Sequence, residues 1–191
     1  MRKNYKEERR TTTENAATVA TKKAVKRSDP VDWASYFWEK NDLGDERDAF
    51  LVMSSTLRFH RITTDALEIE LKAHGLNLTD YLLLMTLELS ENGTRLLSRL
   101  AKSLLLLATT ITLATDRLEN TGLVSRDAHP TDLRATYATI TDEGRQFILT
   151  VTNALKEISF GLVGSTPVQQ RKLLAAMTAL RSAAGDVDPA A

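Results

Sequence analysis

Between residues 109 and 134, hydroxyl and guanidinium side chains recur at spacings that suit hydrogen bonding to a nucleic acid. Thr109 and Thr112 fall on one face of a predicted helix, and Arg117 lies on its flank. Short hydroxyl side chains let a helix approach a groove closely, and they bond to phosphate oxygens or base edges. Arg134, in a polar loop farther along, carries the charge that a narrow minor groove attracts. The chemistry that these residues suggest is non-covalent recognition of DNA.

The helix that must present these side chains is predicted over residues 109–120. Four residues that can face a core recur at i, i+3, i+4 and i+7, the spacing of one helical face. These residues are Ile111, Ala114, Thr115 and Leu118. Gly122 follows where the end of a helix favours a left-handed residue.

A second helix and a β-hairpin are predicted on either side of residues 109–120. Ser98 is the expected cap of the preceding helix, and β-branched residues favour strands at 123–126 and 135–140. Thr94–Leu96 is expected to add a short third strand. The order helix, turn, helix, strand, loop, strand is that of a winged helix-turn-helix, which places one helix in a DNA groove and a hairpin beside it.

Flanking segments are predicted to be helical and to supply a dimerisation region, so the expected fold is mainly α with a small β-wing. Their capping residues and apolar periodicity delimit them. We expect a short aromatic helix after Asp29-Pro30, a long helix over 43–74, a helix over 80–91 capped by Thr79, one capped by Thr141, and one from Thr166-Pro167 through Ala183.

Short motifs along most of the chain together resemble the multiple antibiotic resistance regulator (MarR) family. They are LTDY (78–81), LSRLA (97–101), TIT (110–112), DRLE (116–119), GLV (122–124), PTDLR (130–134) and ITDEG (140–144). The resemblance covers roughly residues 45–181. It implies a homodimeric transcription factor of the repressor type that binds a pseudo-palindromic operator in double-stranded DNA and responds to a small anionic or aromatic effector.

The resemblance and the residue chemistry together give two sets of candidate site residues. The DNA-binding set is Ser98, Thr109, Thr110, Thr112, Leu113, Arg117, Arg126, His129, Asp132 and Arg134. The resemblance places an effector pocket near Trp33, His60, Arg61, Tyr81 and Met85. Packing is the alternative for Trp33 and His60, because aromatic residues on a helix usually serve the core.

The chain departs from the family pattern at Leu105, Leu107, Leu113 and Leu133. Relatives commonly have Gly near 105, a Ser or Thr cap near 107, and Arg or Asn at 113. A leucine cannot cap a helix, and it cannot make the bidentate contact that arginine makes with guanine. Leu113 is instead expected to contact a thymine methyl group. The departures also favour an alternative function, a winged-helix protein-interaction module with reduced DNA specificity.

Composition and charge distribution indicate how the chain is organised and which kinds of site it lacks. Basic and acidic residues balance at 25 each, but residues 1–28 carry a net charge of +6. The expected organisation is a disordered basic arm (1–28), N-terminal helices (29–75), the winged helix-turn-helix (76–141), C-terminal dimerisation helices (142–185) and a tail (186–191). Cysteine is absent, so disulfides and thiolate sites are excluded. We expect a cytoplasmic protein with no membrane segment, no cofactor, no metal site and no catalytic residues.

Overall fold

The computed structural model describes residues 29–132 and 134–186. The predicted basic arm, the end of the predicted tail and Leu133 lie outside these residues. Contacts divide the chain between Arg61 and Ile62 into two units. This division falls within helix α3 (Arg47–Ala73), so the two units are described separately.

The first unit holds α2 (Pro30–Lys40) and the first part of α3. Asp29 caps α2 as predicted, because its carboxylate accepts a hydrogen bond of 2.8 Å from the Val31 N–H. The Trp38 indole donates to the Gly44 carbonyl at 2.8 Å and lies 5.0 Å from the Phe50 ring. At least one aromatic residue of α2 therefore packs within this unit.

The prediction that the long helix begins at Leu43 was wrong. α3 begins at Arg47, because the preceding turn contains Asp42 at a φ of 50° and Gly44 at a φ of 88°. Positive φ values are incompatible with a right-handed helix. Arg47 then pairs with Asp48 and Glu39, and these hydrogen bonds raise the pKa of Arg47 above its usual value.

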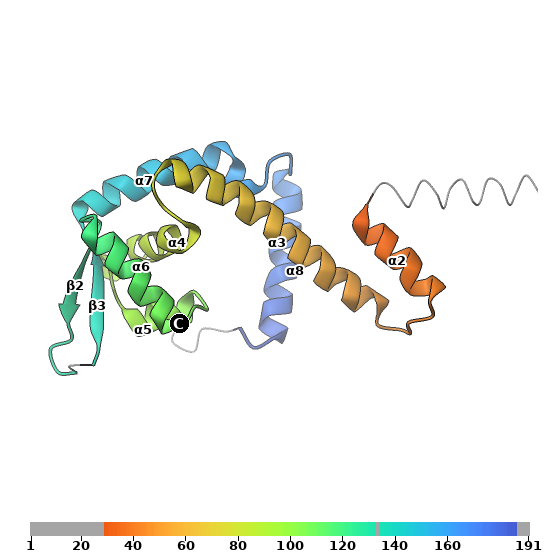
Figure 1. Cartoon of the computed structure of the whole chain (residues 1–191), viewed down its shortest axis with the longest axis horizontal. Helices are drawn as coiled ribbons and strands as arrows, with labels where there is room; N and C mark the ends of the chain where they lie inside the picture. The colour runs from red at the N-terminus through yellow and green to blue at the C-terminus, as the bar shows by residue number, and fades with distance from the viewer. Residues whose placement is uncertain (1–28, 133, 187–191) are drawn as a thin grey trace, which may run out of the picture. The chain divides into compact units, whose positions relative to one another are not determined.

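The second unit contains the predicted helix-turn-helix and wing (Figure 1). Its elements after α3 are α4 (Leu78–Glu88), η1 (Glu91–Gly93), β1 (Thr94–Leu96), α5 (Leu97–Ser103), α6 (Ala108–Asn120), β2 (Val124–Ala128), β3 (Thr136–Ile140), α7 (Asp142–Glu157), η2 (Ser159–Gly161) and α8 (Pro167–Ala183). The antiparallel sheet has the order β1-β3-β2. β2 and β3 extend as a hairpin beside α5 and α6 (Figure 1).

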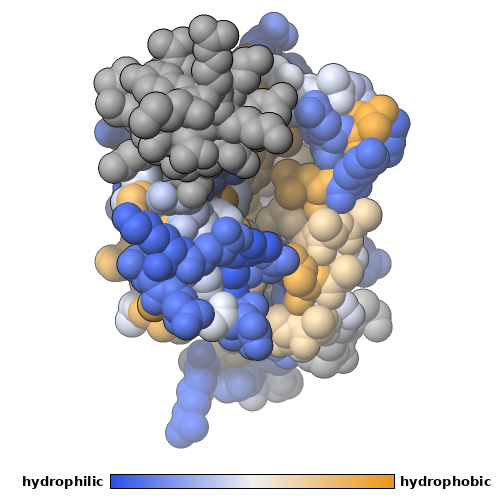
Figure 2. Space-filling view, turned by 90° about the vertical axis from the view of Figure 1, so that its right-hand side faces the viewer, coloured by the Kyte–Doolittle hydropathy of each residue, from blue (hydrophilic) through white to orange (hydrophobic). Residues whose placement is uncertain are grey.

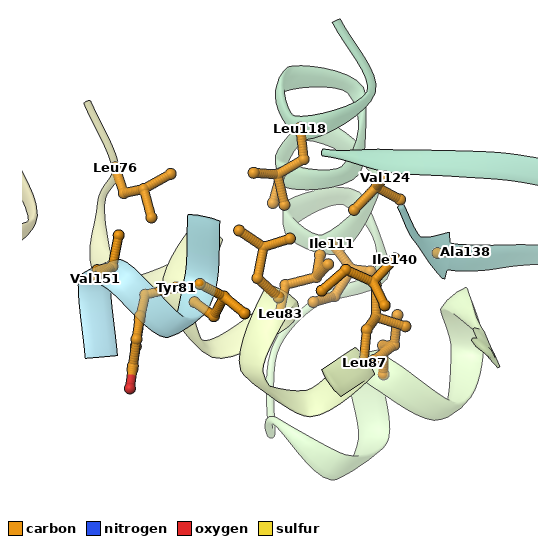
Figure 3. Close-up of a cluster of buried hydrophobic side chains, with 14 of the residues drawn as sticks. Leu76, Tyr81, Leu83, Leu87, Ile111, Leu118, Val124, Ala138, Ile140 and Val151 are labelled. Atoms are coloured by element: carbon orange, nitrogen blue, oxygen red, sulfur yellow. The ribbon is translucent and has the colours of Figure 1, made fainter. Parts of the chain in front are cut away.

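One apolar core joins the helix-turn-helix to the sheet and to α7. Leu83 and Leu87 of α4, Ile111 and Leu118 of α6, and Ile140 of β3 converge in this core (Figure 3). Leu83, Leu87 and Ile111 are fully buried. The predicted inward face of α6 is therefore confirmed, since Ile111, Ala114, Thr115 and Leu118 are its buried residues.

Two predicted helix caps were wrong, and both errors concern short polar residues close to a helix start. α4 is capped by Asn77 rather than Thr79, and the Asp80 N–H donates to the Asn77 side chain at 2.9 Å. α5 is preceded by Leu96, which makes no side-chain cap, and Ser98 lies inside the helix. Thr141 and Thr166 cap α7 and α8 as predicted.

The turn between α5 and α6 places Leu105 in a backbone conformation that suits glycine. The Leu106 N–H donates to the Ala101 carbonyl at 2.9 Å, which is the long bond of a Schellman motif. Leu105 has a φ of 52°, whereas Gly75 and Gly122 take the matching position after α3 and α6, with φ values of 74° and 75°. A leucine with positive φ costs on the order of 1 kcal/mol.

We predict that Leu105→Gly stabilises the protein by about 0.5–1 kcal/mol. The substitution relieves backbone strain, and the leucine side chain contributes little packing because it is 78% exposed. Urea denaturation followed by circular dichroism measures the change. Lys102→Gly, at an exposed position in the last turn of α5, is the control and should destabilise by about 0.5–1 kcal/mol. A Leu105→Gly protein that is less stable than the wild type would contradict the inferred backbone strain at Leu105.

Among the described residues no single helix is long and apolar enough to cross a membrane. α5 and α6 meet the length and composition criteria only as a pair, across a bend of 116°.

Candidate nucleic-acid interface

The outward face of α6 carries Thr109, Leu113, Asp116 and Asn120. These residues recur at i, i+4, i+7 and i+11, opposite the buried face, and Leu113 is 59% exposed. Thr110 and Thr112 lie to either side, and the Thr112 hydroxyl donates to the Ala108 carbonyl at 3.0 Å. The structure thus presents the predicted threonines and Leu113 on one side of a single helix.

Arg126 of β2 connects the hairpin to α6. Its guanidinium pairs with Asp116, lies 3.3 Å from a Glu119 oxygen, and donates to the Thr112 carbonyl at 3.1 Å. The Arg126 side chain is only 21% exposed. Arg126 therefore partly offsets two negative charges on α6 and joins the hairpin to this helix. The predicted contact of Arg126 with DNA stays a prediction.

Arg117 of α6 pairs with Asp80 of α4. Arg117 Nη2 lies 2.6 Å from Asp80 Oδ1, and Nε lies 3.4 Å from Oδ2. The Asp80 side chain is 6% exposed and that of Arg117 is 50% exposed. The pair ties the end of α6 to the start of α4, so Arg117 has a structural role whether or not it also meets a phosphate.

We predict that Arg117→Met destabilises the protein by about 2 kcal/mol. The variant keeps an apolar stem but leaves the buried Asp80 carboxylate without its cation, and solvent at the exposed arginine end moderates the cost. Urea denaturation of Arg117→Met, Asp80→Asn and the double variant measures the coupling. If the two single effects simply add, the pair contributes no interaction energy.

His129 and Asp132 shape the tip of the hairpin. His129 Nδ1 accepts hydrogen bonds from the N–H groups of Thr131 (3.3 Å) and Asp132 (3.2 Å), and its ring stacks on Tyr137 at 5.3 Å. The Asp132 carboxylate accepts from the Arg134 N–H at 3.0 Å. These hydrogen bonds hold the backbone N–H groups of residues 131, 132 and 134, and the Arg134 side chain is exposed.

Exposed cations border this surface on α5. Arg99 and Lys102 are exposed, as is the predicted contact residue Ser98. The basic side chains suit phosphate contact, because their charge neutralises the DNA backbone without reading its sequence. Hydroxyls on α6, cations on α5 and an exposed Arg134 on the hairpin therefore lie within one unit.

The candidate effector residues are divided between the two units. Tyr81 and Met85 belong to α4, where the Tyr81 hydroxyl lies 3.3 Å from the Thr152 hydroxyl and Tyr81 is 6% exposed. Trp33, His60 and Arg61 belong to the other unit. The pocket that would combine them stays a prediction. In residues 29–132 and 134–186, no group of three or more His, Asp or Glu could hold a metal ion.

Comparisons with known proteins find one matching family model and similarity to transcriptional regulators. The family model described as MarR family matches residues 76–136. The regulator MhqR of Bacillus subtilis is 36% identical over 95 residues, which are 50% of this chain and 62% of MhqR. The Streptomyces coelicolor regulator Sco5413 is 30% identical, with a TM-score of 0.68 over 74% of this chain and 98% of that one. Sco3205, from the same organism and solved with DNA, is 28% identical, with a TM-score of 0.60 over 73% of this chain and 88% of that one.

Proposed function

Because this chain belongs to the MarR family, we propose that it is a transcriptional regulator that binds double-stranded DNA as a homodimer. The observation that carries the proposal is the outward face of α6, which presents Thr109 and Leu113 while Arg126 fixes the hairpin beside it. α6 would enter the major groove and the hairpin would reach an adjacent part of the duplex. The DNA complex of Sco3205 supports this use of the fold.

The apolar surface of α8 supports the proposed dimer. α8 contributes no buried residue, and its exposed apolar side chains include Leu173, Leu174, Met177 and Leu180. Figure 2 shows apolar side chains reaching the surface next to hydrophilic ones. An exposed apolar stripe on a helix is typical of a surface that pairs with another helix. Two chains paired by a two-fold axis would present two copies of α6 to successive grooves.

We extend the proposal to control by a small effector, for which Tyr81 and Met85 of α4 are the candidate contacts within the second unit. In the proposed dimer, an effector that favours a spacing of the two α6 helices that does not match successive grooves of DNA would weaken operator binding. Linkage then requires DNA to weaken effector binding by the same factor.

Salt-dependent binding of the purified chain to duplexes selected from a random library tests DNA binding. We expect affinity to fall at least about 100-fold between about 50 and about 200 mM salt, because phosphate contacts release counterions. Arg99→Gln/Lys102→Gln should flatten this dependence by about one unit of slope per lost contact. Arg171→Gln/Lys172→Gln on α8 is the charge-matched control and should leave it unchanged.

The alternative is a winged-helix module that contacts proteins and has little DNA specificity. Leu105 and Leu107 favour it, because they are 78% and 74% exposed in the turn before α6. Failure to select any duplex from the library, or an affinity indifferent to salt, would exclude the proposed DNA-binding function and favour this module.

A further inference from the structure

We infer that Leu113 selects thymine in the DNA site, by packing its methyl groups against the thymine 5-methyl group in the major groove. The inference rests on the proposed function and deepens it, since it names the base that the centre of α6 reads. It makes Leu113 a specificity-determining residue and predicts an operator with a required thymine in each half-site.

The position of Leu113 on α6 is the first step. The outward residues Thr109, Leu113 and Asp116 are spaced at i, i+4 and i+7, so Leu113 lies at the middle of the face that would meet base edges. A leucine 59% exposed at this place has no packing role that would explain it. Its opposite-face neighbours Ile111 and Ala114, by contrast, are fully buried.

The charges around Leu113 are the second step. No Lys or Arg lies on the outward face of α6 within the described structure. Arg117 is held by Asp80, and Arg126 is held by Asp116 and Glu119. The bidentate arginine contact that reads guanine is therefore not available from the middle of α6.

The chemistry of the major groove is the third step. Thymine alone presents a methyl group there beside its O4 acceptor, whereas the polar groups of guanine, adenine and cytosine lose water against an apolar side chain without any gain from methyl burial. An exposed leucine therefore favours thymine twice, through burial of two apolar surfaces and through the cost it places on the other bases. Asp116, on the same face, is paired with Arg126.

Uracil substitution isolates the methyl group and tests the inference. Duplexes selected by the full-length wild type are resynthesised with deoxyuridine in place of each thymidine in turn, symmetrically in both half-sites. Uracil keeps every hydrogen-bonding group and lacks only the methyl. At one position we expect about a fourfold loss of affinity per methyl group, and so about 16-fold for the two half-sites. Leu113→Ala should bind the thymine and uracil duplexes within about twofold of each other.

The controls separate failure of the inference from failure of the proposed function. Leu89→Ala removes a leucine that is 76% exposed at the end of α4 and should keep the wild-type uracil sensitivity. Wild-type binding that is indifferent to uracil at every position overturns the inference and leaves DNA binding in place. Uracil sensitivity that persists in Leu113→Ala also overturns it, because another side chain then reads the methyl. Absence of binding to any duplex overturns both.

Discussion

The double variant Leu173→Glu/Leu180→Glu is expected to be a monomer at micromolar concentration and to bind DNA at least about 100-fold more weakly than the wild type. Leu173 and Leu180 lie on one side of α8 and are 39% and 58% exposed. In the proposed dimer they would be buried, and a carboxylate in an apolar interface carries a desolvation cost of several kcal/mol. A monomer then loses the gain that comes from binding two half-sites at once.

Light scattering after size exclusion measures the mass, and fluorescence anisotropy measures DNA affinity. Thr178→Glu/Ser182→Glu adds the same charge to the opposite side of α8 and should remain a dimer. The far-ultraviolet circular dichroism of both variants should match the wild type, because α8 contributes no buried residue to the core. A Leu173→Glu/Leu180→Glu protein that stays dimeric would show that α8 is not part of the interface.

Gly144→Ala is expected to destabilise the protein by about 3 kcal/mol, which corresponds to a melting temperature lower by about 10 °C. Gly144 lies in the first turn of α7, where an added Cβ would stand 2.2 Å from the Leu123 carbonyl oxygen and 2.8 Å from an Ile140 side-chain carbon. The nearest obstacle is backbone, so the clash is relieved only if α7 moves away from the segment that joins α6 to β2.

Thermal unfolding of Gly144→Ala beside Thr150→Ala tests this packing. Thr150 lies on the exposed side of the same helix, and its loss should change stability by no more than about 0.5 kcal/mol. Gly144→Ala should also bind DNA more weakly than its folded fraction predicts, because the clash displaces the segment that joins α6 to β2 and so changes how α6 and the hairpin are placed. Equal stability of the two variants would contradict the close approach at Gly144.

The helices and strands of the helix-turn-helix and wing were predicted from patterns among residues close together in the sequence. The apolar periodicity of α6, the left-handed Gly122 after it and the threonine cap of α7 involve residues within a few positions of one another. β-branched residues predicted the hairpin in the same way. The helix-turn-helix and wing could therefore be predicted from the sequence before any long-range contact was known.

The contacts that position the candidate site could not be predicted in this way. Arg117 and Asp80 are 37 residues apart, and each reads in the sequence as an ordinary surface charge. The pairing of Arg126 with Asp116 depends on how β2 lies against α6. The sequence predicted that both arginines contact DNA, because a free cation is the simplest expectation beside it. The resemblance to the family indicated which segment would bind DNA, but it did not show that Arg117 and Arg126 form ion pairs within the protein.

The start of α7 is hydrogen-bonded to the corner between α6 and β2. The Thr141 hydroxyl donates to the Gly122 carbonyl at 2.7 Å, and the Thr141 N–H donates to the Leu123 carbonyl at 3.1 Å. Gly144 also packs directly against the Leu123 backbone, so α7 and the turn between α6 and β2 are in close contact. We therefore expect a tilt of α7 to move α6 and the hairpin with it, because these contacts join the start of α7 to the segment between them.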